Sequence, residues 1–179
     1  SGSTLVENDR VIAMYHGRKV GNMVAVSSDP LLLNWQKLTD KPVIPMLQEN
    51  GSPQPFTVFD PCIWKKDGEY YSLSAGTRPI APLGKPVRAN FLLRSSDLKT
   101  WEFLHPFVEQ DVYSLVGDDG ACPYFWPIGT GNDQKHILLF YSHMSGGQYL
   151  LGDYDKSRDK FVVRRGAKFN FMASNFSQF

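Results

Sequence analysis

Short apolar runs separated by polar turns recur along the chain, and no segment keeps the 3.6-residue apolar period of an amphipathic helix. Four runs precede a proline-rich loop, at residues 4–6, 11–15, 22–28 and 35–38. Four more follow it, at residues 60–64, 70–76, 91–96 and 101–104. A third group occupies residues 121–126, 135–143, 148–155 and 161–163. Runs of this length between Gly, Pro, Asn and Asp are typical of β-strands, so the pattern predicts an all-β chain.

Two motifs in these groups repeat at a nearly constant spacing. Asp29 and Trp35 in the first group correspond to Asp97 and Trp101 in the second, with almost the same offset for both pairs. The segments 60–64 and 121–126 correspond in the same way, at a slightly shorter offset. Four short strands per repeat indicate the blades of a β-propeller. We expect the repeated aspartates to form structural turns and the repeated tryptophans to lie in the core.

The repeats predict a partial β-propeller over residues 1–170 and leave residues 171–179 as an unassigned tail. Each repeat has a period of roughly 60–68 residues, which is long enough for one four-stranded blade. About three blades' worth of sequence is present. A closed propeller needs at least four blades, and an open fan of blades exposes sheet edges. We therefore expect the sequence to be part of a longer chain.

Composition narrows the classes of partner. The net charge is +1 with both signs interspersed, which predicts neither a nucleic-acid nor a membrane-surface partner. No apolar run approaches the ~20 residues of a membrane span. The two cysteines, Cys62 and Cys122, are expected to be buried free thiols, and the four histidines show no metal-ligand spacing. An aromatic content of 13% suits β-sheets and sugar-binding clefts alike.

The order of the motifs resembles that of glycoside hydrolase family 32, the β-fructosidases, which include invertases, inulinases and levanases. Five segments carry the resemblance: Ser-Gly-Ser-Thr at 1–4, Phe-Asp-Pro at 59–61, Ser-Ser-Asp-Leu with its Trp at 95–101, Ala-Cys-Pro at 121–123 and Gln-Tyr-Leu-Leu-Gly-Asp-Tyr-Asp at 148–155. The family has Ser-Gly-Ser-Ala, Arg-Asp-Pro, Ser-x-Asp-Leu-x-x-Trp, Glu-Cys-Pro and Tyr-x-x-Gly-x-Tyr-Asp at these places. The resemblance implies a five-bladed β-propeller with an axial pocket.

The resemblance also implies a retaining glycosidase with three acidic residues. Its nucleophilic aspartate belongs to an Asn-Asp-Pro-Asn motif upstream of the Ser-Gly-Ser segment. Asp60 corresponds to the aspartate that binds sugar hydroxyls and stabilises the oxocarbenium-like transition state. Ala121 stands where the family has the glutamate that acts as general acid and base, and alanine cannot transfer a proton. Three explanations stay open: an introduced Glu-to-Ala change, a proton supplied by Asp119 or Asp118, and a relative that binds sugar without cleaving it.

Four further residues are candidate substrate ligands: Ser3 in the first motif, Trp64 after the second, Arg78, and His143 at a strand end. The predicted function is binding and hydrolysis of fructosyl bonds, as in sucrose, inulin or levan, without a cofactor or metal. The alternatives are a related five-bladed glycosidase acting on arabinosyl or xylosyl chains and a non-catalytic, carbohydrate-binding propeller. The resemblance favours a secreted or periplasmic location and leaves the oligomeric state open.

Overall fold

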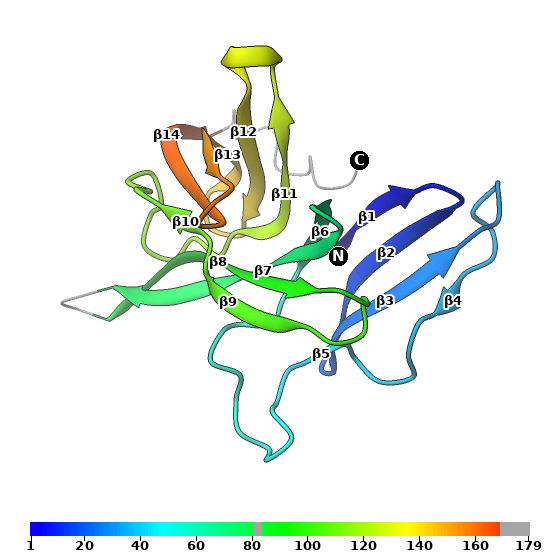
Figure 1. Ribbon diagram of the computed structural model, residues 1–179. Coiled ribbons are helices and arrows are strands. Elements are labelled where there is room, and N and C mark those ends of the chain that lie inside the picture. Colours follow the sequence, from blue (N-terminus) through cyan, green and yellow to red (C-terminus); the bar gives the residue numbers. More distant parts are fainter. Residues whose placement is uncertain (81–83, 169–179) are drawn as a thin grey trace. The chain divides into compact units, whose positions relative to one another are not determined.

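The computed structural model describes residues 1–80 and 84–168, which form three β-sheets (Figure 1). The tail expected at 171–179 lies outside the described residues. Within them, the only helical element is a 3₁₀ turn, η1 (Gly131–Asp133). None of the described segments is a helix long and apolar enough to cross a membrane. The prediction of an all-β chain is therefore confirmed.

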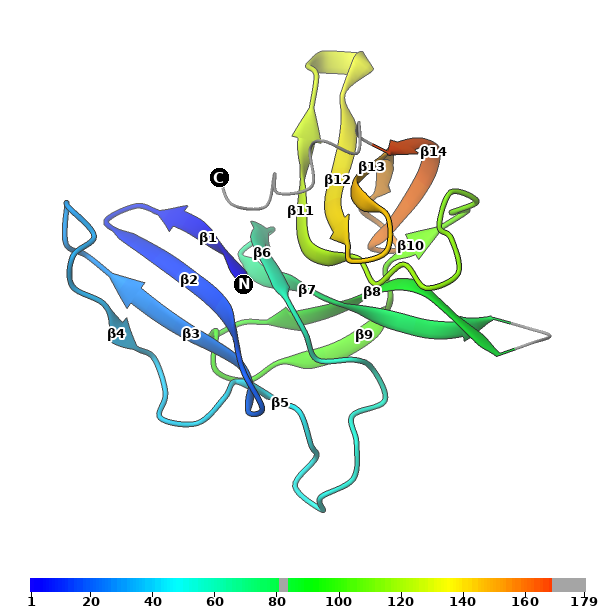
Figure 2. The ribbon, with the colours of Figure 1, turned by 180° about the vertical axis from the view of Figure 1, so that it is seen from behind.

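Most strands that follow one another along the chain are neighbours in a sheet, as Figures 1 and 2 show. The first sheet has the order β1-β2-β3-β4, with β5 also paired to β3: β1 (Gly2–Glu7), β2 (Arg10–Gly17), β3 (Gly21–Ser27), β4 (Gln36–Lys37) and β5 (Ile44–Pro45). The second has the order β6-β7-β8-β9: β6 (Pro61–Lys66), β7 (Glu69–Ile80), β8 (Lys85–Ser95) and β9 (Glu102–Pro106). The third has the order β10-β14-β13-β12-β11: β10 (Val108–Glu109), β11 (Ala121–Ile128), β12 (Lys135–Ser142), β13 (Gly146–Asp155) and β14 (Lys160–Lys168).

The strands β7 and β8 are longer than the sequence pattern predicted. We expected strands at 70–76 and 91–96, whereas β7 reaches Ile80 and β8 begins at Lys85. Pro79 and Pro86 are the reason that these extensions were not predicted. Proline lacks the N–H group that a strand ladder needs and is common in turns, so the sequence pattern predicts strands that exclude both prolines. The two-residue strands β5 and β10 were also missed.

The chain divides into two compact units, each of which is described by itself. Unit 1 consists of residues 1–74 and 91–105, and unit 2 of residues 75–90 and 106–179. The first sheet belongs to unit 1 and the third sheet to unit 2, while β7 and β8 contribute segments to both.

The core of unit 1 is aliphatic and follows the two-residue period of its strands. Ile12 and Met14, both fully buried, lie two positions apart on β2 and therefore point to the same face of the sheet. Val24 on β3 is paired in register with Met14 and is fully buried too. Ile63 on β6 and Leu93 on β8 complete the same cluster. This apolar face holds β6, which follows the candidate site residue Asp60, against the first sheet.

The turn between β8 and β9 is built around Asp97. Its carboxylate accepts hydrogen bonds of 2.8 Å from the backbone N–H groups of Lys99 and Thr100. Leu98 has a positive φ of 66°, and its carbonyl accepts a 3.0 Å hydrogen bond from the indole N–H of Trp101. The side chain of Leu98 is buried, so the turn is fastened to the core of unit 1.

The same construction recurs after β3. Asp29 accepts hydrogen bonds from the N–H groups of Leu33 and Asn34, and Leu32 has a positive φ of 56°. The indole N–H of Trp35 donates to the Leu32 carbonyl at 2.8 Å. The two aspartates are thus structural turn residues, as predicted. Trp35 is 41% exposed, however, so its placement in the core was wrong: its turn is two residues longer and lies on the surface.

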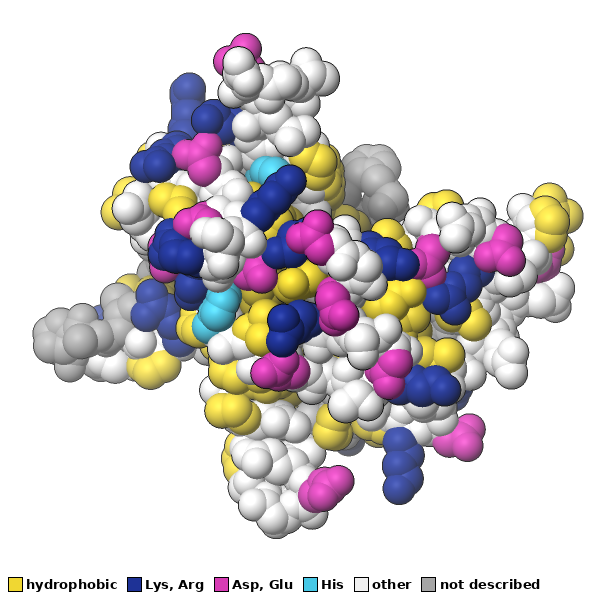
Figure 3. Space-filling view, in the orientation of Figure 1, with side chains coloured by type: hydrophobic (Ala, Val, Ile, Leu, Met, Phe, Trp, Pro, Cys, Tyr) yellow, Lys and Arg dark blue, Asp and Glu magenta, His cyan; other side chains and the backbone are white. Residues whose placement is uncertain are grey.

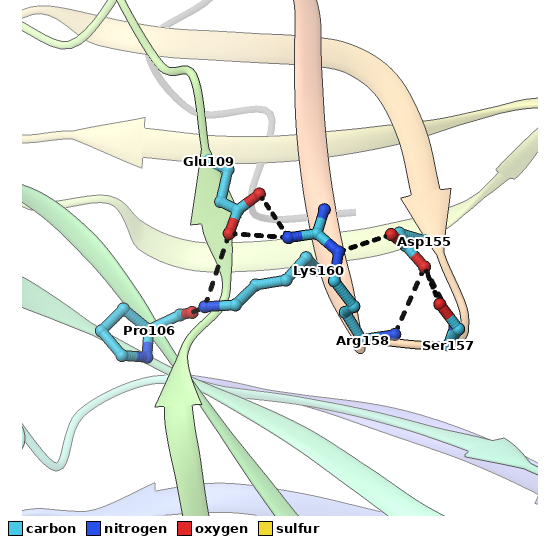
Figure 4. A network of polar contacts seen from close by, with 6 residues as sticks. All are labelled: Pro106, Glu109, Asp155, Ser157, Arg158 and Lys160. Atoms are coloured by element: carbon cyan, nitrogen blue, oxygen red, sulfur yellow. Dashed lines mark hydrogen bonds and ion pairs between the residues drawn. The ribbon is translucent and has the colours of Figure 1, made fainter.

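Unit 2 closes one edge of the third sheet with a parallel pairing. The strand β10 pairs with β14 through Val108↔Phe161 and Glu109↔Val162. Arg158, before β14, bridges Glu109 and Asp155, and the Lys160 ammonium donates to the Pro106 carbonyl at 2.6 Å (Figure 4). These polar contacts join β10 to the end of β13 and the start of β14.

On the face shown in Figure 3, basic and acidic side chains are interspersed rather than segregated. This distribution matches the near-zero net charge of the sequence. Among the described residues, no group of three or more His, Cys, Asp or Glu side chains is arranged to hold a metal ion. Neither of the two cysteines, both of them among the described residues, forms a disulfide; Cys62 is buried as expected, whereas Cys122 is only half-buried.

Candidate active site

Asp60 lies directly before β6, and its side chain is buried, with 6% exposed. Phe59, the residue before Asp60, is fixed by a hydrogen bond and by a ring contact. The Phe59 N–H donates to the Ser74 hydroxyl at 2.9 Å, and the Phe59 ring lies 5.1 Å from the ring of His16. Pro61 then begins the strand, and the steric bulk of its ring restricts the backbone conformations of Asp60 before it. The sequence therefore builds a preorganised position for this carboxylate.

Two further candidates of unit 1, Ser3 and Trp64, are connected with β6, the strand that follows Asp60. The hydroxyl of Ser3, on β1, accepts a 2.8 Å hydrogen bond from the backbone N–H of Ile63 and so connects β1 to β6. Trp64 is half-buried and stacks on Tyr71 with ring centroids 5.8 Å apart. Sugar contacts of Ser3 and Trp64 remain predictions.

The Ala-Cys-Pro segment has an unusual backbone. Ala121 begins β11 and is buried, and Cys122 adopts a positive φ of 50°, which is uncommon for a residue other than glycine. The pairing of β11 with β12 shifts register between Ala121 and Tyr124, which is a β-bulge. Such irregularities re-aim a side chain and are common beside functional sites. Here the two residues that fall within the shift are Cys122 and Pro123, directly after Ala121.

Asp118, in the loop that precedes Ala121, is fully buried. Its Oδ1 accepts hydrogen bonds from Ser142 at 2.8 Å and Ser145 at 2.6 Å, and its Oδ2 accepts one from the Leu115 N–H at 2.8 Å. Burial opposes ionisation of Asp118, but these hydrogen bonds outweigh it and hold the pKa of the carboxyl below its ordinary value. Asp118 therefore fixes the loop to the end of β12, and its catalytic role stays a prediction.

Asp119, the next residue, points to a different partner. Its Oδ2 lies 2.6 Å from His143 Nδ1, and its Oδ1 accepts a 3.3 Å hydrogen bond from the His143 backbone N–H. The side chains of His143 and Asp119 are 67% and 30% exposed. Two candidates that lie far apart in the sequence thus form an accessible carboxylate–imidazole pair. Neither periodicity nor motif order could have predicted this contact.

Arg78, the remaining candidate, is an exposed residue of β7 that lines a cavity of unit 2. Arg88 and Asn90 on β8 and Asp111 line the same cavity and were missed by the sequence analysis. The segment Val87-Arg88-Ala89-Asn90 alternates apolar and polar residues, which is a strand pattern. Residues two positions apart on a strand lie on the same face of the sheet, so this alternation could have placed Arg88 and Asn90 side by side.

The chain matches a protein-family model described as the glycosyl hydrolases family 32 N-terminal domain over residues 1–176. It belongs to this family. The match covers nearly all of the sequence and includes the five motifs identified above. The recognition of a family 32 chain from the order of those motifs is therefore confirmed.

Among curated proteins, the chain is 26% identical over 148 residues to the insoluble isoenzyme 2 of β-fructofuranosidase from Daucus carota, covering 75% of this chain and 23% of that protein. Among solved structures, it is similar to a sucrose-6-phosphate hydrolase from Lactobacillus gasseri, with a TM-score of 0.67, 20% identity and coverage of 95% of this chain and 36% of that one. It is also similar to the family 32 β-fructofuranosidase of Bombyx mori, with a TM-score of 0.64, 23% identity and coverage of 95% and 37%.

The structural likenesses confirm the expected fold class, an all-β chain of the five-bladed β-propeller type. The three sheets agree with the expectation of about three blades' worth of sequence. The chain spans about a quarter of the length of the carrot enzyme and little more than a third of the two solved structures.

Proposed function

We propose that this chain is part of a β-fructosidase-type glycosidase that binds fructosyl bonds and hydrolyses them with retention. Membership of family 32 supports the glycosidase class. The names of its relatives, β-fructofuranosidase and sucrose-6-phosphate hydrolase, support a fructosyl substrate such as sucrose, inulin or levan. The observation that carries the proposal is the buried, preorganised carboxylate of Asp60 at the start of β6.

In this proposal Asp60 stabilises the positive charge that develops on the sugar ring in the transition state. A carboxylate that is fixed before the reaction does not have to reorganise when that charge appears. Burial strengthens the interaction, because little water surrounds the carboxylate to screen it. The anchored neighbour Phe59 and the ring of Pro61 support this role, since both restrict the movement of the Asp60 backbone.

We assign the proton transfer to Asp119 in place of the glutamate that the family has at the Ala121 position. A general acid must reach the glycosidic oxygen, and Asp119 is accessible, whereas Asp118 is enclosed by its hydrogen-bond partners. His143, 2.6 Å from the Asp119 carboxylate, is placed to exchange a proton with it. The network of Asp118 holds the backbone of the loop on which Asp119 lies.

A second candidate function is carbohydrate binding without hydrolysis. The methyl group of Ala121 favours it, because loss of the acid in a retaining glycosidase lowers the rate by about 10²–10⁴-fold. Asp60 retains its sugar-binding role in this alternative. The two functions therefore differ in turnover and share sugar binding.

The test uses the full-length protein, assayed for sugar release from sucrose, inulin and levan, with arabinan and xylan in parallel. We expect release of fructose, and we expect Asp60→Asn and Asp119→Asn each to lower kcat by about 10²–10⁴-fold. The variant His143→Gln should lower kcat as well, because it removes the side chain that holds the Asp119 carboxylate at 2.6 Å. Asp133→Asn, an exposed aspartate of unit 2 outside this pair, is the matched control and should leave kcat unchanged.

Each outcome separates one hypothesis from another. Full activity of Asp119→Asn would contradict the assignment of the proton donor, while leaving the fructosidase function intact. Sugar binding without any turnover would replace hydrolysis by the binding function. Release of arabinose or xylose alone would overturn the fructosyl specificity.

A further inference from the structure

Unit 2 contains a cavity of about 160 Å³, lined by β7, β8, β10 and the segment that follows β10. Its polar lining residues are Arg78, Arg88, Asn90, Asp111 and Ser114. Pockets that enclose whole drug-sized ligands have volumes of roughly 300–1,000 Å³, and one water molecule takes up about 30 Å³ of liquid. The cavity therefore suits a single functional group and a few water molecules, rather than an oligosaccharide.

Arg88 is the most deeply buried charge of the cavity, with 1% of its side chain exposed. It forms an ion pair with Asp111, donates to Asn90 Oδ1 at 2.9 Å, and lies with its guanidinium carbon 4.1 Å from the centre of the Phe140 ring. Burial lowers the pKa of Arg88, and the nearby carboxylates of Asp111 and Asp118 oppose that shift. A guanidinium in such a position is stabilised by every further acceptor that reaches it.

The acceptor capacity of Asp111 is already used. Its Oδ1 accepts from the N–H groups of Tyr113 and Ser114, at 3.0 and 3.2 Å. Its Oδ2 accepts from the Ser114 hydroxyl at 2.6 Å and from Arg88. A carboxylate offers about four lone-pair sites, so these four hydrogen bonds saturate it. Asp111 can neutralise the charge of one guanidinium group, but it has little capacity left to accept hydrogen bonds from a ligand.

The unused groups of the lining are donors. Arg88 Nε and Asn90 Nδ2 are buried and have no hydrogen-bond partner in the described part of the chain. The Arg78 side chain likewise forms no ion pair or hydrogen bond with another described residue. Buried donors without an acceptor are rare and costly, because they lose their bonds to water on folding. The complementary ligand is one that only accepts hydrogen bonds.

We propose that this cavity is a binding site for a small anionic group, a phosphate or a carboxylate, held by Arg78, Arg88 and Asn90. Two arginines and one aspartate give the lining a charge of +1, which a single negative charge balances. Planar guanidinium groups suit both anions, because they can donate two parallel hydrogen bonds. The site does not depend on hydrolysis, and it remains testable if the protein has no glycosidase activity.

Calorimetric titration of the full-length protein with sodium phosphate and with sodium acetate, at constant ionic strength, tests the site. We expect saturable binding of at least one anion. Arg78→Gln, at an exposed position, should weaken it about fivefold or more. Asn90→Asp keeps the oxygen that accepts from Arg88 and replaces the free donor by a negative charge, so it should abolish binding. Binding of phosphate alone would indicate a phosphorylated ligand, and binding of both anions a carboxylate-bearing one as well.

The matched control is Arg165→Gln, which removes one exposed positive charge of β14 in the same unit without touching the cavity. It should bind the anion as the parent protein does. The proposal is overturned if neither anion binds saturably, since the cavity would then hold only water. Equal binding by the parent protein, Arg78→Gln and Asn90→Asp would also overturn it, because the anion would then lie elsewhere.

Discussion

Glu7, at the end of β1, is the residue on which three polar side chains of unit 1 converge. Its carboxylate pairs with Lys65, accepts two hydrogen bonds from Arg10 at 2.7 and 3.0 Å, and accepts from the Tyr70 hydroxyl. The hydrogen bond from Lys65, followed by those from Arg10, lowers the pKa of Glu7 from 4.5 to about 2. The Glu7 side chain is only 13% exposed, whereas Arg10 and Lys65 are 35% and 39% exposed, so solvent screens these interactions in part.

We expect the free energy of unfolding to depend on Glu7 in a narrow pH window. Because its pKa is lower in the folded chain, ionised Glu7 adds stability that is fully present above pH 4.5 and is lost as the pH falls toward 2. Glu7→Gln should cost about 2 kcal/mol at pH 7 and almost nothing at pH 2. Urea denaturation at a series of pH values measures this difference. Glu102→Gln, which breaks the exposed pair with Arg94, is the control and should change stability by less than about 0.5 kcal/mol.

Gly120 is a second position at which one residue decides the local structure. It has a positive φ of 60°, and a Cβ atom there would lie 2.5 Å from the Arg88 side chain. Gly120→Ala should therefore cost about 2–3 kcal/mol and displace the loop that carries Asp119. Gly131→Ala, at a φ of 58° with no atom within 4 Å, separates backbone strain from the clash and should cost about 1 kcal/mol. Equal losses of unfolding free energy in the two variants would show that Arg88 does not constrain the loop.

At the scale of elements, the repeated aspartate turns offer an internal comparison. Both aspartates accept hydrogen bonds from the two residues that follow a leucine with positive φ. Leu98 is 2% exposed, whereas Leu32 is 42% exposed. Asp97→Ala should therefore cost about 1–2 kcal/mol, because loss of the turn also loosens a core side chain. Asp29→Ala should cost clearly less. Urea denaturation of both variants tests this order, and the reverse order would contradict the role of the buried leucine.

The same turns show why a strand repeat can be predicted from sequence while its burial cannot. The Asp and Trp positions repeat because the hydrogen bonds of the turn are local and require those residue types. Whether the turn meets the core depends on the neighbouring elements, and the sequence of the turn does not contain that information. Asp29 was therefore assigned correctly to a structural turn, whereas Trp35 was assigned wrongly to the core.

At the scale of the whole molecule, the sheets and the family could be predicted because both rest on short motifs in a fixed order. The residue before β6, Asp60, was singled out on that basis. The contacts of Asp119 with His143 and of Arg88 with Asp111 could not be predicted, since each joins segments that are distant from one another in the sequence. Arg88 was also missed because the prolines of β7 and β8 argue against a strand at its position.

The pairing of β10 with β14 constrains the order in which unit 2 is completed during folding. Hairpins such as β12–β13 join residues close in sequence and form early, at a small cost in loop-closure entropy. The strand β10 has no partner close to it in sequence. Val108 pairs with Phe161 of β14, which is synthesised only after β11, β12 and β13. The strand β10 leaves the ribosome before the other strands of the third sheet, and its partner β14 is the last of them to follow. Until β14 arrives, β10 is an open edge, which makes this short segment the natural target of a chaperone or of a neighbouring nascent chain.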